Sequence, residues 1–167
     1  KVDLGVGVYK DDQGNTPVPA AVKRAEAELI AVQSSKAYLS PVGNPGFNAQ
    51  VLELVMGADH AGRKGDVAAV QAPGGSGARR LGAELLRVSS PDSAVHVSDP
   101  TWANHIPLLG SAGFKIERYP YYSAAKHTVE FDRMTAHLGA LPSGAVVVLH
   151  ACCHNPAGQD LTITQWA

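Results

Sequence analysis

The chain has 167 residues, of which 45% are hydrophobic, enough for one domain with a hydrophobic core. Fourteen Lys and Arg residues stand against fifteen Asp and Glu residues, and the resulting net charge of −1 argues against nucleic acid or an anionic membrane as a partner. No apolar run approaches the roughly 20 residues of a membrane span, and the N-terminus lacks a signal-peptide layout, so we expect a cytoplasmic protein.

Two amphipathic helices are predicted near the N-terminus. Residues 20–33 place apolar side chains at helical spacing with charged residues between them, directly after Pro17 and Pro19. Residues 46–57 show a second helical pattern after a turn-rich segment.

From residue 66 onward, short apolar runs alternate with helical patterns. The predicted elements are a strand over residues 66–73, a helix over 75–88, a strand over 94–100, a helix over 102–113, a strand over 114–120, a helix over 131–141 and a strand over 144–153. This alternation predicts an α/β fold with a mainly parallel sheet and helices on both faces.

The two ends of the chain suggest a piece of a longer protein. Lys1 is not a start methionine, and the last residues read as a helix beginning at a Thr162 or Thr164 cap, with Trp166 as its first large apolar residue. We therefore expect the chain to be a fragment.

Ligands of a parallel sheet bind beyond the carboxyl ends of its strands, which here selects three segments, APGGSG, SDPTWANH and HACCHNPAG. In the first, glycines let backbone N–H groups approach an anion, a helix start adds unpaired N–H groups, and Ser76 adds a hydroxyl. The segment matches neither the P-loop nor the GxGxxG fingerprint. A phosphate site and a plain tight turn both remain open.

Single polar or aromatic residues mark the other two segments. The Trp102 indole suits stacking on an aromatic ligand, or it covers the core. His105 shares a helical face with Trp102 if the helix starts there, and it supports the ring or the ligand, or is a satisfied core histidine. Asn155, placed at the end of a strand, offers a donor and an acceptor to a ligand oxygen.

The run HACCH at residues 150–154 raises the question of a metal or redox site. On a strand, His150, Cys152 and His154 would project to one face and Cys153 to the other, which does not suit tetrahedral zinc. A redox site more usually shows CxxC, and adjacent cysteines do not easily form a disulfide. We expect no metal, and we interpret the cysteines as reduced, buried small hydrophobes.

Five motifs together resemble the aspartate and aromatic amino-acid aminotransferases, which are class I, fold-type I pyridoxal-phosphate enzymes. In the family's order and spacing, they are LGVGVYKDDQGNTPVP, YLSPVGNPGF, QAPGGSGARRLGAELL, VSDPTWANH and LHACCHNPAG. The resemblance implies the large cofactor domain of this fold for residues 17–167 and the smaller domain or its hinge for residues 1–16. Ala157 stands where the family usually has threonine, and Arg79 where it generally has an apolar residue.

The resemblance also implies the cofactor, pyridoxal 5'-phosphate, and roles for single residues. Gly75 and Ser76 would bind its phosphate, Trp102 would stack on its pyridine ring, and Asn155 would hydrogen-bond its phenolic oxygen. Tyr38 would reach the phosphate of the neighbouring subunit's cofactor in a homodimer. Gly7 would contact the substrate carboxylate, and His105 would steady the carboxylate partner of the pyridine nitrogen.

The implied activity is amino transfer between an amino acid, aspartate or aromatic, and 2-oxoglutarate. The family's Schiff-base lysine, pyridine-nitrogen carboxylate and substrate arginines lie beyond Ala167 in family order, so we expect no catalytic residue in this segment and no activity from it alone. Two alternatives stay open: another fold-type I enzyme, such as a lyase or decarboxylase, and a non-catalytic phosphate-binding α/β module.

Overall fold

The computed structural model describes residues 7–61 and 67–167. Residues 1–6, part of the predicted segment 1–16, lie outside the described residues, as do Asp66, which begins a predicted strand, and the lysines at 1 and 64. The chain divides into two compact units, Lys1–Pro41 and Val42–Ala167, and each is described by itself.

The first unit contains helix α1 (Ala20–Val32), which confirms the helix predicted over residues 20–33. It begins directly after Pro19 and is rich in alanine and glutamate, both good helix formers. Within the described residues, Leu29 and Val32 on its apolar face are 56% and 76% exposed.

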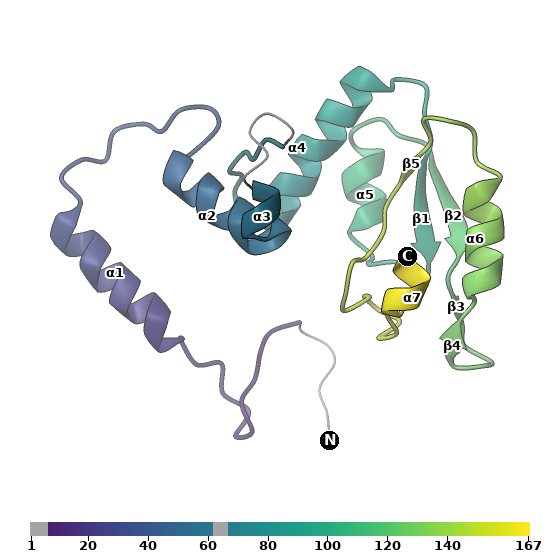
Figure 1. Cartoon of the computed structure of the whole chain (residues 1–167), viewed down its shortest axis with the longest axis horizontal. Helices are drawn as coiled ribbons and strands as arrows, with labels where there is room; N and C mark the ends of the chain where they lie inside the picture. The colour runs from purple at the N-terminus through teal and green to yellow at the C-terminus, as the bar shows by residue number, and fades with distance from the viewer. Residues whose placement is uncertain (1–6, 62–66) are drawn as a thin grey trace. The chain divides into compact units, whose positions relative to one another are not determined.

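The second unit holds the remaining elements, which Figure 1 shows in chain order. Its helices are α2 (Pro45–Met56), α3 (Ala58–Ala61), α4 (Gly74–Ser89), α5 (His105–Gly110), α6 (Phe131–Gly139) and α7 (Ile163–Trp166). Its strands are β1 (Val95–Asp99), β2 (Ile116–Pro120), β3 (Tyr122–Ser123), β4 (Thr128–Val129) and β5 (Val146–Val147).

A parallel sheet with strand order β2-β1-β5 forms the centre of the second unit. Val95 of β1 pairs with Ile116 of β2 on one side and with Val146 of β5 on the other. Parallel neighbours need a crossover, and here α5 connects β1 to β2 while α6 lies between β2 and β5. This arrangement confirms the predicted α/β fold.

Two clusters of buried side chains cover the two faces of the sheet. One contains Val95 and Val97 of β1 together with Leu109 of α5. The other contains Tyr119 of β2 and Met134 of α6. Figure 1 shows α5 and α6 on opposite sides of β1 and β2, so helices lie on both faces, as predicted.

Two features of the strands differ from the prediction. The strand predicted over 66–73 is wrong for the described residues 67–73, which are irregular. A strand needs a neighbour to accept its hydrogen bonds, and the backbone of this segment instead donates from Gln71 N–H to the Val42 carbonyl at 3.0 Å. The last strand is shorter than predicted because the ladder with β1 covers only Val146 and Val147.

A close contact at Gly43 fixes the segment that leads into α4. Gly43 has a φ of +90°, and a Cβ placed on it would lie 2.3 Å from the Gln71 Cβ. The Gln71 side chain also accepts a hydrogen bond from Asn44 N–H at 2.8 Å, and Asn44 in turn caps α2. Glycine is required here because the backbone is left-handed and the neighbour leaves no room for a side chain.

Candidate functional site

The first site segment is the start of α4, whose predicted helix is confirmed. The helix begins at Gly74 with a φ of +65°, and its N-cap is Pro73, which makes no side-chain capping bond. Within the described part of the chain, the N–H groups of Gly75 and Ser76 and the Ser76 hydroxyl have no hydrogen-bond partner. Unpaired donors at the positive end of a helix form a binding site for an anion.

The second segment follows β1 and carries Trp102 and His105. The helix predicted to start at Trp102 begins only at His105, whose N–H donates to the Trp102 carbonyl at 2.9 Å. The two rings nevertheless meet edge to face, with centroids 5.3 Å apart and planes at 87°. The His105 Nδ1 also lies 2.9 Å from the Thr101 hydroxyl, so His105 is a buried histidine with a polar partner.

The third segment runs from His150 to Gly158, and here the structure corrects the sequence interpretation. The strand has ended at Val147, so the argument that placed His150, Cys152 and His154 on one strand face is wrong. The chain instead bends through Cys153, whose φ is +53°. Because these residues lie in a surface loop, both cysteines are exposed free thiols rather than buried hydrophobes.

Asn155 lies within this loop and not directly at a strand end. Its backbone N–H donates to the His150 Nδ1 at 3.3 Å. The side chain is exposed, and its amide makes no hydrogen bond to any residue that the structure describes. The amide is therefore available to a ligand, both as donor and as acceptor.

A chain of contacts connects the three segments. The Arg79 guanidinium of α4 lies over the Trp102 ring, with Cζ 4.9 Å from the ring centroid. The Trp102 ring meets His105, and the His105 and His150 rings have centroids 5.2 Å apart. His150 Nδ1 accepts a hydrogen bond from the Asn155 N–H. Helix α4, through Arg79, is therefore connected in the second unit to the second and third predicted segments.

Sequence reasoning missed a stack of three aromatic rings beneath this loop. The His154 ring lies between Tyr121 and His150, with centroid distances of 3.9 and 4.0 Å and nearly parallel planes. The His154 Nε2 lies 3.0 Å from the buried Ser98 hydroxyl of β1. The four-residue spacing of His150 and His154 was a visible signal, but Tyr121 lies far away in the sequence.

The surroundings of the histidines favour their neutral forms. Burial, together with the neighbouring His150, lowers the pKa of His105 and of His154 to about 4. Burial, followed by the charge of Arg79, lowers the pKa of His150 as well. Near neutral pH these rings therefore act as uncharged hydrogen-bonding and packing groups.

The acidic residue of the third loop is Asp160. Its carboxylate accepts the N–H groups of Cys153 and His154 at 2.7 and 2.8 Å. These backbone hydrogen bonds, the one from His154 above all, lower the pKa of Asp160 because they stabilise the charged form. Asp160 thus holds the loop that presents Asn155.

Two candidate residues, Gly7 and Tyr38, belong to the first unit and not to this cluster. Tyr38 is fully exposed, and a Cβ placed on Gly7 would meet no atom within 4 Å.

Residues 7–61 and 67–167 contain neither a cluster of metal ligands nor a membrane-spanning helix. No group of three His, Cys, Asp or Glu side chains there is arranged to hold a metal ion. In the same part of the chain, every helix is too short or too polar to cross a bilayer.

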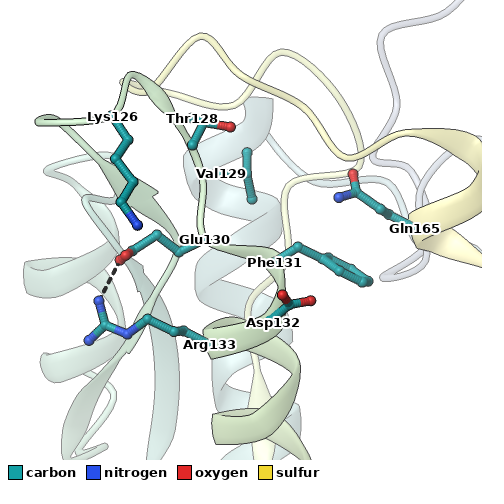
Figure 2. A pocket seen from close by; sticks show the side chains of 8 residues that line it. All are labelled: Lys126, Thr128, Val129, Glu130, Phe131, Asp132, Arg133 and Gln165. Carbon is teal, nitrogen blue, oxygen red and sulfur yellow. Dashed lines mark hydrogen bonds and ion pairs between the residues drawn. The ribbon is translucent and has the colours of Figure 1, made fainter.

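A hollow lies next to α6 in the second unit, and Figure 2 shows the side chains that line it. Its volume is about 380 Å³, and it is lined by Lys126, Thr128, Val129, Glu130, Phe131, Asp132, Arg133 and Gln165. An ion pair between Arg133 and Glu130, 2.7 Å long, crosses part of its wall. It shares no residue with the three site segments.

The chain is similar to known proteins over its whole length. The family model described as "Aminotransferase class I and II" matches residues 1–167. The aromatic-amino-acid aminotransferase of Paracoccus denitrificans is 44% identical over 168 residues, which cover 100% of this chain and 42% of that protein. The aspartate aminotransferase of Escherichia coli (strain K12) is 42% identical over 167 residues, again covering 42% of its length.

Solved structures show the same relationship. An aromatic amino acid aminotransferase from Burkholderia cenocepacia J2315 superimposes with a TM-score of 0.95 at 46% identity, covering 99% of this chain and 42% of that one. An aromatic-amino-acid aminotransferase from Burkholderia pseudomallei, covalently bound to pyridoxal phosphate, superimposes with a TM-score of 0.93 at 43% identity. The match again covers 99% of this chain and 42% of that one. This chain therefore spans about 42% of the length of these relatives, and it belongs to the class I and II aminotransferase family.

Proposed function

We propose that this chain is part of a pyridoxal-phosphate-dependent aminotransferase that transfers an amino group between an amino acid and a 2-oxo acid. The observation that carries the proposal is the chain of contacts that leads from Arg79 of α4 through the Trp102, His105 and His150 rings to the loop of Asn155. Within the described residues, the start of α4 offers unpaired N–H groups and Asn155 offers its amide. The relatives support it, since they carry the names aromatic-amino-acid and aspartate aminotransferase.

The groups of this cluster match the chemistry of the cofactor. The N–H groups of Gly75 and Ser76 and the Ser76 hydroxyl would hold its phosphate, because they are unpaired donors at a helix start. Trp102 would stack on the pyridine ring, and the unpaired Asn155 amide would donate to the phenolic oxygen. When bound, the cofactor supplies an electron sink that stabilises negative charge on the substrate carbon.

The surrounding histidines keep these groups in place. The His105 and Trp102 rings meet edge to face and His105 is held by Thr101, so His105 limits the rotation of the indole. We also propose that His105 steadies the carboxylate partner of the pyridine nitrogen, as the family resemblance implies. A neutral ring with one nitrogen bonded to Thr101 leaves the other nitrogen for that contact.

The remaining roles concern the complete enzyme, by which we mean the longer protein that we propose contains this chain. Aspartate or aromatic amino acids and 2-oxoglutarate would be its substrates, with Gly7 contacting a substrate carboxylate. Tyr38 would reach the cofactor phosphate of the neighbouring subunit in a homodimer. Residues 1–16 would belong to the smaller domain and residues 17–167 to the large one.

The catalytic lysine would be supplied from outside this chain, because none of its seven lysines lies in a motif resembling the catalytic one. The segment alone would then be inactive. We place the enzyme in the cytoplasm, in keeping with the two free, adjacent thiols.

Removing the Asn155 amide is expected to weaken cofactor binding by the complete enzyme about 10-fold to 100-fold. A hydrogen bond to a charged oxygen contributes about 1.5–3 kcal/mol, which sets this range. The measurement is the dissociation constant of pyridoxal phosphate for wild type and Asn155→Ala, from the absorbance of the bound cofactor. Gln159→Ala is the matched control in the same loop. Among the described residues, the Gln159 side chain makes no hydrogen bond, and its backbone carbonyl, which the substitution keeps, accepts from the Tyr121 hydroxyl.

The same preparation tests the reaction. With aspartate and 2-oxoglutarate, we expect the amino group to appear on the oxo acid. Cofactor binding without any amino transfer from aspartate or an aromatic amino acid would favour a lyase or decarboxylase. No cofactor binding at all would contradict the proposed function.

A further inference from the structure

Arg79 departs from the pattern of the motif that contains it, and the structure shows where its side chain goes. Gly75 and Arg79 are four residues apart on α4 and so share a helix face. The Arg79 Nη1 lies 3.2 Å from the position of a Cβ built on Gly75, so the side chain runs back towards the start of the helix. Its Cζ lies over the Trp102 ring at 4.9 Å.

The indole is the direct partner that the structure gives to this guanidinium. Within the described residues, no carboxylate forms an ion pair with Arg79, whereas the adjacent Arg80 pairs with Glu84 and bonds to the Ser111 hydroxyl. Two consecutive arginines on one helix therefore make different contacts. Arg80 ties α4 to its own next turn and to α5, and Arg79 reaches Trp102.

Two contacts, one with His105 and one with Arg79, then restrict the Trp102 indole. His105 meets the Trp102 ring with the two planes at 87°, which limits rotation on one side. The Arg79 cation lies over a ring face, and a guanidinium is attracted to the electron-rich face of an indole. Trp102 is only partly buried, so these contacts replace the packing that a core residue would have.

We propose that Arg79 is a positioning residue that holds one face of Trp102 and leaves the opposite face for the cofactor ring. This inference rests on the proposed function, because it assigns the free face to the cofactor. Arg79 acts through the indole and does not itself bind the phosphate. The charge effect of Arg79 on His105 and His150, whose pKa values it helps to lower, agrees with a guanidinium located between these segments.

A double-mutant cycle on the complete enzyme tests how Arg79 acts. Arg79→Met keeps the length of the side chain and removes the charge, and we expect it to weaken pyridoxal phosphate binding about threefold. Arg79→Lys should restore part of the loss, and the matched control Arg80→Met should leave the dissociation constant unchanged. In a Trp102→Phe background, Arg79→Met should have a clearly smaller effect, since phenylalanine offers a weaker partner than indole.

Two results of the cycle would overturn the proposal. An undiminished effect of Arg79→Met in the Trp102→Phe background would mean that Arg79 contacts the cofactor directly. An Arg79→Met enzyme that binds the cofactor as wild type does would mean that the contact positions nothing.

A second measurement needs no cofactor and separates this proposal from the proposed function. Acrylamide quenching of tryptophan fluorescence is recorded on the cofactor-free complete enzyme, and the Trp102 signal is obtained by subtracting that of Trp102→Phe. We expect Arg79→Met to raise the quenching of Trp102 about twofold and Arg80→Met to leave it unchanged. Unchanged quenching in Arg79→Met overturns the proposal, even if wild type binds no pyridoxal phosphate and the proposed function fails.

Discussion

Lowering the pH from 6.5 to 4 is expected to destabilise the folded protein by up to about 2.7 kcal/mol per pH unit, because His105 and His154 stay neutral in the fold. Burial lowers their pKa to about 4 from 6.5, so in this range the unfolded chain binds about two protons more. Their contribution to stability is complete above pH 6.5 and is lost as the pH falls towards 4.

The measurement is the free energy of unfolding of the complete enzyme, from denaturant titrations between pH 4 and 8. His154→Phe keeps a ring between Tyr121 and His150 but cannot titrate. Only His105 then contributes, so the free energy of unfolding of this variant should fall by at most about 1.4 kcal/mol per pH unit from this source. Above pH 7 the free energy of unfolding should depend on pH equally in wild type and His154→Phe, which serves as the internal control. Equal slopes of both proteins between pH 4 and 6 would show that His154 is not held neutral.

Replacing Gly43 by alanine is expected to cost about 3 kcal/mol of folding free energy and to weaken cofactor binding. The backbone at Gly43 has a φ of +90°, and the new Cβ would lie 2.3 Å from the Gln71 Cβ and 2.7 Å from its Oε1. Strain in the left-handed region costs about 1–2 kcal/mol, and displacing Gln71 breaks its bond to Asn44 N–H. Gln71 lies just before the Gly74 turn, so the phosphate donors of α4 would shift with it.

Gly57→Ala separates backbone strain from the clash. Gly57 has a φ of +81°, but a Cβ built on it meets no atom within 4 Å. This variant should lose only the backbone strain, about 1–2 kcal/mol, and should bind the cofactor as wild type does. Denaturant titration gives the loss of folding free energy, and the dissociation constant of pyridoxal phosphate gives the loss of cofactor binding. Equal losses in the two variants would contradict the close contact of Gly43 with Gln71.

The sequence alone predicted those structural elements that depend on residues close together in the chain. Thr162 was one of two candidate caps, and it forms a capping box with Gln165 at the start of α7. The glycine turn at residues 74–77 begins a helix, and the alternation of strands and helices gave the parallel sheet. Caps, turns and periodicity depend on neighbours within a few residues, so the sequence shows them directly.

Features that depend on distant partners were not predictable. Residues 67–73 have the composition of a strand, but strand pairing depends on which segment lies beside them, and the backbone here pairs with Val42. The short hairpin of β3 and β4 also escaped prediction, since each strand has only two residues. The exposure of Cys152 and Cys153 follows from the loop that replaces the predicted strand end.

The candidate site was predicted from the sequence only as separate residues. Gly75, Ser76, Trp102, His105 and Asn155 each follow from motif position, but no pattern says that Arg79 reaches Trp102 across 23 residues of chain or that His154 stacks on Tyr121. Those contacts are set by the packing of α4 and of the β2 end against the loops. Such packing is a tertiary property that single-sequence patterns do not contain.

A crystal structure of the complete enzyme with pyridoxal phosphate bound tests most directly whether the three loops form the cofactor site. We predict the phosphate oxygens at about 3 Å from the N–H groups of Gly75 and Ser76, the pyridine ring stacked on Trp102, and the Asn155 amide at about 3 Å from the phenolic oxygen. A cofactor bound elsewhere in the protein, with Trp102 and Asn155 both out of contact with it, would contradict the account.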